Sequence, residues 1–462
     1  MHKHKLLSRI QLSSFRIFNR NVASVSAFGD ISNVHTSHQQ ILSNPKELAI
    51  LVSTCSNLKQ LRQVFAQIIQ TRFLELYPAS FHYNNISRTY IRLLSPREAS
   101  RVYIAMRRAG ISPDEFTLPI VLKAASRNLD VVLAGQVHGF AVKYGMENDM
   151  YCVSGLISSY SKGGRFEMAQ KVFLCSPVRK LGHWNAIIAG LSQGGRGKEA
   201  LRMFVEMMES GICPDDMTMV GVTSACGSLS DLNLALQLHK FAFQVNRLEK
   251  PDVLTMNSVI DMYGKCGRMD LAYKVFCDME EKNVSSWTSM IVGYAAHGHV
   301  DDALRCFSCM IEAGITPNHV TFVGVLTACV HGGMVQEGKY YFNMMKNSYG
   351  IEPMLPHYGC MIDLLGRAGM LDEANLMVKG MPMKPNAVIW GCLMGACEKY
   401  GNVKLGEYVA KHLIELEPGN SGVYVVLSNI YANSGMWKDL ERIRKILRER
   451  KLAINPSYSL LK

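Results

Sequence analysis

Apolar residues recur along this chain with the spacing of an amphipathic helix, and the same arrangement returns every 31 to 37 residues. In one example, Ala303, Leu304, Phe307 and Met310 fall at i, i+1, i+4 and i+7, which places them on one helical face. The small residue that opens this arrangement has equivalents along the chain: Ala99, Ala134, Ala169, Ala200, Ala235, Ala272, Ala303, Gly338, Ala374 and Gly406. A fixed period of this size predicts a stack of similar structural repeats.

Each repeat is predicted to be a hairpin of two helices. The segment from Trp184 to Leu191 has its own apolar face, and Gly194 and Gly195 separate it from the helix that carries Ala200. Several second helices end in Gly-Ile-x-Pro, where Gly supplies a left-handed cap and Pro cannot continue the helix; these are 110–113, 211–214 and 314–317. A lone hairpin cannot bury its apolar face, so stacking on neighbours must complete the core. The pattern therefore predicts an all-α solenoid.

The composition adds a preference for an acidic partner. The 462 residues are 48% apolar, and 50 Lys and Arg against 38 Asp and Glu give a net charge of +12, which favours nucleic acid. No stretch reaches the roughly 18 consecutive apolar residues of a membrane-spanning helix, so no membrane partner is expected. The 13 Cys are scattered through helical patterns, which predicts reduced thiols instead of a disulfide framework.

The first 29 residues have the composition of an organellar transit peptide. They contain five serines and no Asp or Glu, and their basic residues include Lys3, Lys5, Arg9, Arg16 and Arg20. We interpret residues 1–40 as a mitochondrial transit peptide and linker, because arginine and large apolar residues dominate the segment. A chloroplast address and a disordered basic tail are the alternatives.

Three segments resemble the pentatricopeptide repeat proteins of plant organelles: Trp184-Asn185-Ala186-Ile187-Ile188, Trp287-Thr288-Ser289-Met290-Ile291 and Gly264-Lys265-Cys266-Gly267. The separations cycle through 35, 35 to 37, and 31, which is similar to the P, L and S triplet of the subclass linked to RNA editing. The resemblance implies a right-handed superhelical α-solenoid of tandem helix-turn-helix repeats. A degenerate repeat occupies 45–79, and repeats cover 80–386 as 80–114, 115–149, 150–180, 181–215, 216–252, 253–283, 284–318, 319–354 and 355–386.

Residues 387–462 are similar to the E-type extension of the same family, which consists of helical hairpins like tetratricopeptide repeats. The resemblance rests on residues 390–397 and 427–432, and it implies that a deaminase or other editing-complex proteins are recruited through this extension. Its aromatic residues are candidates for packing or docking: Trp390, Tyr424, Tyr431 and Trp437.

No catalytic residue, metal or cofactor is predicted. Longer relatives end in a zinc deaminase whose signature is H-x-E followed by C-x-x-C, and this sequence contains no H-x-E triplet. Its C-x-x-C, Cys306 and Cys309, falls within a second helix and is interpreted as core packing, because a tetrahedral site needs further ligands.

The resemblance implies that the fifth and last residues of a repeat read one RNA base. For the P- and S-type repeats these pairs are Asn84 with Asp114, Ser154 with Lys180, Asn185 with Asp215, Asn257 with Asn283, and Thr288 with Asn318. A last-position Asp accepts from the imino N–H of U or G, whereas Asn can donate to the bare ring nitrogen of C or A. Helix capping is the alternative role for all these residues.

The same code predicts U for repeats 80–114 and 181–215, C or U for 253–283, and A for 284–318. Lys180 departs from the pattern, so repeat 150–180 is given no base. Pro119 and Val220 in the L-type repeats cannot hydrogen-bond through their side chains and are interpreted as spacers. The family also places the second residue of a repeat against each base, a role open to Phe81 and Leu254 but not to Gly182.

A second set of residues is basic at position thirteen of the repeats. These residues are candidates for RNA phosphate contacts, with solvated loop charge as the alternative: Arg92, Arg127, Lys162, Lys265 and Arg367. The sequence as a whole predicts an adaptor that binds single-stranded organellar RNA and marks a cytidine for conversion to uridine. A splicing or stability factor with the same binding mode, and a peptide-gripping scaffold, are the rival interpretations.

Overall fold

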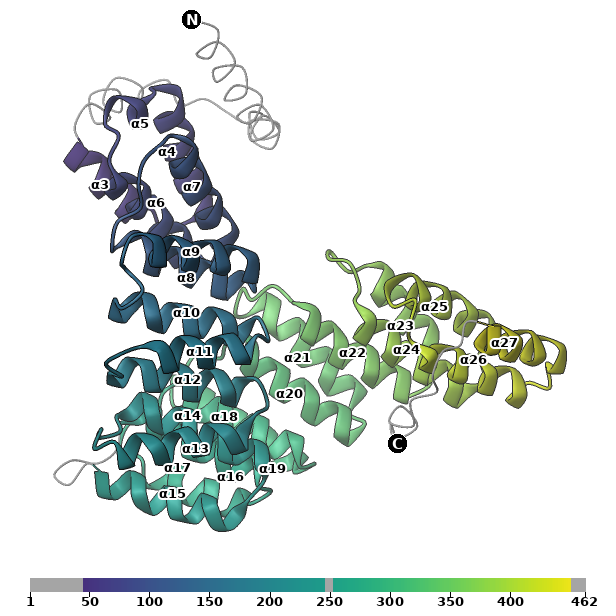
Figure 1. Cartoon of the computed structure of the whole chain (residues 1–462). Coiled ribbons are helices and arrows are strands. Elements are labelled where there is room, and N and C mark those ends of the chain that lie inside the picture. Colours follow the sequence, from purple (N-terminus) through teal and green to yellow (C-terminus); the bar gives the residue numbers. More distant parts are fainter. Residues whose placement is uncertain (1–44, 246–251, 450–462) are drawn as a thin grey trace, which may run out of the picture. The chain divides into compact units, whose positions relative to one another are not determined.

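The computed structural model describes residues 45–245 and 252–449, and within these ranges every regular element is a helix (Figure 1). The prediction of an all-α repeat fold is confirmed. The predicted transit peptide and linker, 1–40, lies outside the described residues. No helix among the described residues is both long enough and apolar enough to cross a membrane. The chain divides into two compact units, and the boundary falls between Val172 and Phe173.

The first compact unit contains the degenerate repeat and the repeats that follow it. Residues 45–79 form a helical hairpin and one short further turn. The helices of this unit are α3 Pro45–Thr54, α4 Leu58–Gln70, α5 Phe73–Leu76, α6 Ser80–Arg92, α7 Pro96–Arg108, α8 Thr117–Asn128, α9 Val131–Lys143 and α10 Met150–Lys162, and α11 Phe166–Cys175 spans the boundary.

The second compact unit continues the same alternation through the extension. Its helices are α12 Leu181–Gln193, α13 Gly197–Glu209, α14 Asp216–Leu229, α15 Leu232–Val245, α16 Val253–Lys265, α17 Met269–Asp278, α18 Val284–Ala296, α19 Val300–Glu312, α20 His319–Gly332, α21 Val335–Asn347, α22 Leu355–Arg367, α23 Leu371–Lys379, α24 Ala387–Tyr400, α25 Val403–Leu416, α26 Ser421–Asn433 and α27 Trp437–Glu449.

The first helix of each repeat begins where the period places it, at residues 80, 150, 181, 216, 253, 284, 319 and 355, and α24 begins at 387. Repeat 115–149 is the exception, because α8 begins at Thr117. There the Asp114 carboxylate accepts from the backbone N–H groups of Phe116 and Thr117, so the capped turn precedes the helix proper.

The first helices of successive repeats pack against one another. In the second unit α12, α14, α16, α18, α20, α22 and α24 contact one another in that order, and in the first unit α6 contacts α8 and α8 contacts α10. The small residue of each second helix lies at a close approach: Ala200 and Ala303 are fully buried. At Gly338 a methyl group would lie 2.4 Å from Leu364 Cδ2. The repeating small residue therefore allows the helices to stack closely.

The predicted turn glycines adopt the left-handed conformation that they were expected to supply. Gly110, Gly211 and Gly314 have φ of 77°, 74° and 72° at the ends of α7, α13 and α19. An L side chain rarely adopts this conformation, so glycine ends these helices at little cost.

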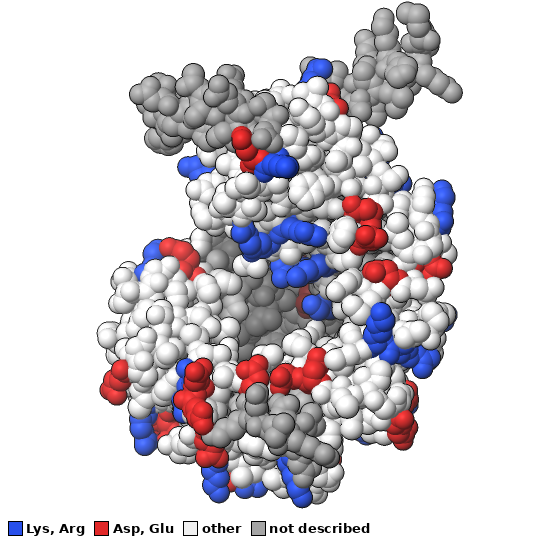
Figure 2. Space-filling view, turned by 90° about the vertical axis from the view of Figure 1, so that its left-hand side faces the viewer, with Lys and Arg blue, Asp and Glu red and all other residues white. Residues whose placement is uncertain are grey.

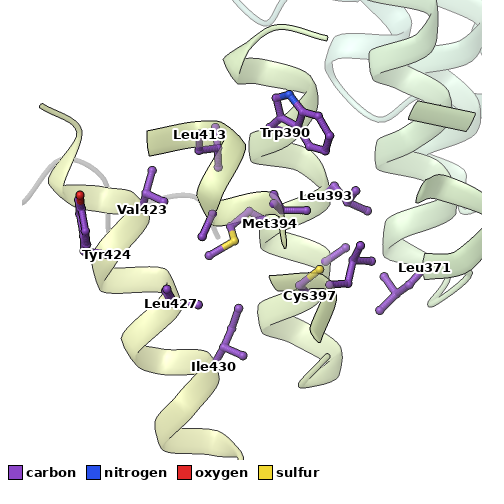
Figure 3. Close-up of a cluster of buried hydrophobic side chains, with 14 of the residues drawn as sticks. Leu371, Trp390, Leu393, Met394, Cys397, Leu413, Val423, Tyr424, Leu427 and Ile430 are labelled. Atoms are coloured by element: carbon purple, nitrogen blue, oxygen red, sulfur yellow. The ribbon is translucent and has the colours of Figure 1, made fainter. Parts of the chain in front are cut away.

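The extension shares its core with the last repeat. Leu371 of α23 belongs to the same buried cluster as Leu393 of α24 and Ile430 of α26, and Figure 3 shows these side chains directed between the helices. The core is therefore continuous across residue 386, where the E-type extension was predicted to begin.

The Cys-x-x-Cys segment of α19 is only partly in the core. Cys306 packs against the cluster that contains Phe307 and Phe322, and burial raises its thiol pKa to about 12. Cys309 is exposed, so the prediction of core packing is wrong for that residue, which lies on the solvent side of the helix.

Candidate nucleic-acid interface

In four of the five predicted reading repeats the last residue caps the start of the next repeat, and Lys180 is the exception. Asp215 Oδ1 accepts from the Thr218 backbone N–H at 2.8 Å, at the N-terminus of α14. Asn283 and Asn318 cap α18 and α20 through their Oδ1 atoms in the same way. Helix capping, the alternative role, is therefore present. It also holds each of these side chains in one orientation at the junction of two repeats.

The fifth residue reaches the last residue in three of the predicted pairs. Asn185 Nδ2 donates to Asp215 Oδ1 at 2.9 Å. Asn84 Nδ2 donates to Asp114 Oδ1 at 3.0 Å, and Asn257 Nδ2 donates to Asn283 Oδ1 at 3.2 Å. Adjacent first helices lie side by side, so residues 26 to 30 positions apart in the sequence meet at each junction.

The remaining two pairs are arranged differently. Thr288 and Asn318 are joined through Thr321, whose hydroxyl lies 2.7 Å from the Thr288 hydroxyl and 3.1 Å from Asn318 Oδ1. Ser154 donates to the Met150 carbonyl of its own helix at 2.9 Å. Lys180 precedes α12, is exposed and makes no side-chain cap.

Capping decides which hydrogen-bonding group each last residue keeps for a ligand. A backbone N–H can only donate, so the atom of Asn283 or Asn318 that faces it must be the oxygen. The Nδ2 group of each is left without a hydrogen bond to another described residue. An Asp at this place keeps a carboxylate oxygen instead. Asn therefore offers a donor and Asp an acceptor.

Asp114 and Asp215 differ in the donor to the second oxygen, which for Asp215 Oδ2 is Asn185 Nδ2 at 3.2 Å. Ser80, the first residue of repeat 80–114, donates to Asp114 Oδ2 at 2.5 Å. Partial burial disfavours the charged form of Asp114. The hydrogen bonds from Ser80, Thr117 and Asn84 outweigh this effect and lower the carboxyl pKa below its ordinary value. The acceptor that would face a base in this repeat is already occupied.

A row of exposed apolar residues accompanies the polar pairs, and sequence reasoning recognised only part of it. Within each compact unit the second residue of most repeats is a large apolar side chain between 44% and 66% exposed. These are Phe81, Phe116 and Tyr151 in the first unit and Met217, Leu254 and Val320 in the second, and Val388 has the same place in the extension. Apolar side chains in phase on a solvent-facing row are typical of a binding surface. The signal was present in the sequence, as an apolar residue at the second position of successive repeats. Gly182 lacks the side chain, as predicted.

The basic residues at position thirteen are exposed, but most of them are engaged. Arg92 and Arg127 each donate at 2.7 Å to a carbonyl in the neighbouring repeat, those of Cys55 and Ile91. These contacts cap the C-terminal end of the preceding first helix.

Lys265 and Arg367 form ion pairs one helical turn away, with Asp261 at 2.6 Å and Asp363 at 3.0 Å. Lys162 has no hydrogen bond or ion pair with another described residue. On the face in Figure 2, Lys and Arg form separate groups with Asp and Glu groups between them.

Repeat 355–386 contains a hollow that the sequence did not reveal. Its volume is about 420 Å³, and its lining includes the second residue Pro356, the fifth residue Gly359 and the last residue Asn386. Asn386 caps α24 through Oδ1, which accepts from the Ile389 N–H at 3.0 Å. Gly359 has no side chain at the place of Asn185, and a Cβ there would lie 3.7 Å from Ile389 Cδ1, which also lines the hollow.

The aromatic residues of the extension divide into packed and exposed ones. Trp390 is buried and stacks on the His412 ring at a centroid distance of 4.5 Å, and Tyr424 and Tyr431 are buried in the same core. Trp437, at the start of α27, is 66% exposed. Of the four candidates, Trp437 is therefore the one placed for docking. Within 45–245 and 252–449 no three His, Cys, Asp or Glu side chains lie close enough together to hold a metal ion.

Comparison with known sequences decides the family. A mitochondrial pentatricopeptide repeat-containing protein of Arabidopsis thaliana is 55% identical over 90% of this chain and 89% of its own length. This chain belongs to the pentatricopeptide repeat family. A second pentatricopeptide repeat-containing protein of Arabidopsis thaliana, described as chloroplastic/mitochondrial, is 38% identical over 91% of this chain and 72% of its own.

Family models match several segments of the chain. The model described as PPR repeat matches 151–175, 182–212, 320–349 and 356–384, and the model described as PPR repeat family matches 251–286 and 282–331. The model described as E motif matches 400–461, which confirms the predicted E subclass of plant pentatricopeptide repeat proteins.

Solved structures agree on the fold. The pentatricopeptide repeat protein PPR10 from maize covers 85% of this chain and 61% of its own, with a TM-score of 0.53 at 17% identity. PPR10 in complex with an 18-nt psaJ RNA element covers 94% of this chain and 71% of its own, with a TM-score of 0.54 at 16% identity.

Proposed function

We propose that this protein binds single-stranded organellar RNA in a sequence-specific manner and designates cytidines for conversion to uridine. The observation that carries the proposal is the recurrence of a capped polar pair in repeats 80–114, 181–215 and 253–283, accompanied by exposed apolar second residues in most repeats of each compact unit. A single helix cap would not indicate RNA binding. In both Asn185 with Asp215 and Asn257 with Asn283, however, the amide of the fifth residue donates to the capping side chain of the last residue. PPR10, which has the same fold, was crystallised with an RNA element.

Each repeat would hold one base by two kinds of contact. Apolar side chains such as Met217 and Leu254 supply a surface on which a base can stack. Such stacking accepts any of the four bases. The polar pair then faces the Watson–Crick edge and supplies the discrimination. The expected bases are U for 80–114 and 181–215, a pyrimidine for 253–283 and A for 284–318.

The register follows from the family resemblance. The edited cytidine is expected four nucleotides beyond the base over repeat 355–386. This places U, U, pyrimidine and A at twelve, nine, seven and six nucleotides before it. In this register the hollow beside Asn386 would face the nucleotide four positions before the edited cytidine.

The chemistry would be supplied by another protein. We propose that the E-type extension recruits a deaminase, or another editing-complex protein, through the exposed surface around Trp437. The buried Trp390 and Tyr431 would hold the extension rigidly on the last repeat, because the core is continuous there (Figure 3).

A mitochondrial location is proposed on two grounds. The basic, serine-rich and acid-free first 29 residues match a transit peptide, and a relative 55% identical over most of the chain is described as mitochondrial. The chloroplast is the alternative, since another relative is described as chloroplastic/mitochondrial. Import of a fluorescent fusion into isolated organelles distinguishes the two.

Sequencing organellar transcripts with and without the gene tests the function. Loss of one or a few C-to-U events, with the pattern above upstream of the edited site, is expected. An intact editing profile with altered splicing or altered transcript ends would show a splicing or stability factor instead. Equal affinity for matched and scrambled RNA would refute the assignment of bases to repeats.

Recruitment is tested separately from RNA binding. Trp437→Ala is expected to leave the affinity for matched RNA unchanged and to abolish co-purification of deaminase activity. Leu376→Ala is the matched control, because Leu376 on α23 is 67% exposed, comparable to Trp437, and lies outside the extension. Loss of recruitment by both variants, or by neither, would contradict the proposed docking surface.

A further inference from the structure

Thr321 connects the two base-facing residues of repeat 284–318, which do not hydrogen-bond to each other. Its side chain is fully buried at the third position of the following repeat. Its hydroxyl lies 2.7 Å from the Thr288 hydroxyl and 3.1 Å from Asn318 Oδ1, and it accepts from the Asn318 backbone N–H at 3.2 Å. The Thr321 backbone N–H donates to Asn318 Oδ1 at 3.0 Å.

Counting hydrogens gives the direction of each bond. Thr321 has one O–H, and its oxygen has two acceptor sites. If that hydrogen goes to Asn318 Oδ1, Thr288 must donate in the 2.7 Å contact, and all three hydrogen bonds are made. If Thr321 donated to Thr288 instead, Asn318 Oδ1 would lose one donor and the Thr288 hydrogen would lose its acceptor. The first arrangement satisfies more groups in a buried place and is therefore preferred.

This arrangement leaves a defined pair of groups for a ligand. The Thr288 hydroxyl hydrogen is donated to Thr321, so Thr288 can offer a base only its lone pairs. The Asn318 Oδ1 atom accepts from Thr321, so Asn318 offers its Nδ2 amide hydrogens. The Watson–Crick edge of adenine carries the N6 amino donor and the N1 acceptor, which complement this pair. Guanine carries the O6 acceptor and the N1–H donor, so both contacts would be mismatched.

We propose that Thr321 is a positioning residue that sets the hydrogen-bond polarity of Thr288 and Asn318 and so makes repeat 284–318 select adenine over guanine. The inference rests on the proposed RNA-binding function and deepens it. It adds a third residue, located in the next repeat, to the pair that reads the base.

Other repeats have a buried hydroxyl at the same place, with one instructive difference. Thr117 and Ser286 donate to the Oδ1 atoms of Asp114 and Asn283. The single Thr218 hydrogen has two acceptors within reach, Asn185 Oδ1 at 2.6 Å and Asp215 Oδ1 at 2.8 Å. For an Asp both oxygens are acceptors, so the group offered to a base does not depend on which one the hydroxyl holds. Only where the last residue is Asn does the hydroxyl, together with the backbone cap, affect which group is offered to a base. Thr218 is therefore a natural control for Thr321.

The experiment measures full-length protein against RNAs that differ at one nucleotide. The wild-type protein is expected to prefer A over G opposite repeat 284–318. Thr321→Val keeps the shape and removes the hydroxyl, and should lower the A-to-G affinity ratio about three- to tenfold, as expected for loss of one hydrogen bond. Thr218→Val should leave the U-to-C ratio opposite repeat 181–215 within about twofold, because Asp215 can only accept and still holds the Asn185 Nδ2 group toward it.

Two further variants keep the outcome interpretable. Thr321→Ser retains the hydroxyl and is expected to keep the wild-type A-to-G ratio, while Asn318→Asp should reverse it. An unchanged ratio in Thr321→Val, or an equal loss in Thr321→Ser, would overturn the inference even though the protein reads RNA. A wild-type protein indifferent to A and G would instead overturn the proposed base reading of this repeat, and the inference with it.

Discussion

The side-chain amide of Asn185 donates to the carboxylate of Asp215 at 2.9 Å, although 30 residues separate them in sequence. The contact crosses from one repeat to the N-terminal cap of the next. It makes the pair one structural feature, and it determines which atoms remain for a base.

Replacing Asp215 by Asn should change the base that repeat 181–215 prefers. Asn and Asp cap helices about equally well, so α14 should be retained. The Oδ1 atom of the new Asn would cap the helix, so its Nδ2 group would take the place of the second carboxylate oxygen. That N–H donor suits the bare ring nitrogen of C. Preference at that nucleotide is expected to move from U to C by about tenfold, measured as a ratio of Kd values.

The double variant Asn185→Ala plus Asp215→Ala is the control for this exchange. It should bind U and C at that nucleotide equally, because neither polar group remains. An Asp215→Asn protein that still prefers U would show that this carboxylate does not read the base.

Removing the Ser80 hydroxyl should strengthen reading by repeat 80–114. Ser80 donates to Asp114 Oδ2 at 2.5 Å, whereas Asp215 Oδ2 accepts the longer contact from Asn185 Nδ2 at 3.2 Å and the first residue of its repeat is Leu181. Ser80→Ala frees that oxygen for the imino N–H of uracil. Affinity for RNA with U opposite this repeat should rise about three- to tenfold, with affinity for C there unchanged. Equal changes for both RNAs would mean that Ser80 acts on the repeat's stability alone.

Stability should depend on pH through Asp114. Its carboxyl pKa in the folded protein is lowered because the hydrogen bonds from Ser80, Thr117 and Asn84 outweigh partial burial. A lowered folded-state pKa gives a stabilisation that is fully present above the ordinary carboxyl pKa and is lost as the pH falls through the lowered value. The difference in Tm between wild type and Asp114→Asn should therefore be largest near neutral pH and shrink in acid. A difference independent of pH would exclude this carboxylate as the source.

Two basic residues of the first compact unit should behave differently on substitution. Lys162 has no partner among the described residues, so Lys162→Ala should reduce the salt dependence of RNA binding by about one unit of slope, with Tm unchanged. Arg127 donates to the Ile91 carbonyl at 2.7 Å, so Arg127→Ala should cost about 1 kcal/mol of stability. The comparison uses binding titrations across a salt series, together with thermal melts. Equal salt slopes for wild type and Lys162→Ala would remove Lys162 from the phosphate-binding set.

The repeat boundaries could be predicted from the sequence because they depend on local chemistry. The period of small residues located the first helices at 181, 216 and 253, and glycines such as Gly211 end helices wherever they are placed. The pairing of Asn84 with Asp114 and of Asn185 with Asp215 followed from the same register. The α8 start, two residues later than the period indicates, depends on how Asp114 caps its turn.

Other features depend on side-chain geometry across repeats, which a linear pattern does not contain. Arg92 and Arg127 occupy the same position as Lys162, yet only the two arginines reach a carbonyl of the neighbouring repeat. Thr321 has the same place in its repeat as Ile389 has in the extension, but a bond to Thr288 exists only because two helices approach at that point. Cys309 and Cys306 are three residues apart, and only one of them faces the core.

The sequence alone determined the class of fold, the number and phase of the repeats and the residue types at each reading position, because helix periodicity and capping act over a few neighbouring residues. The tertiary structure decided which atoms of those residues are already engaged. Three such features lie where one repeat packs on the next. Ser80 donates to one Asp114 oxygen, the cap at Thr321 fixes the orientation of the Asn318 amide, and the second residues are exposed. Hydrogen bonds at these junctions have strict distance and direction, so they can be assigned only when both helices are in place.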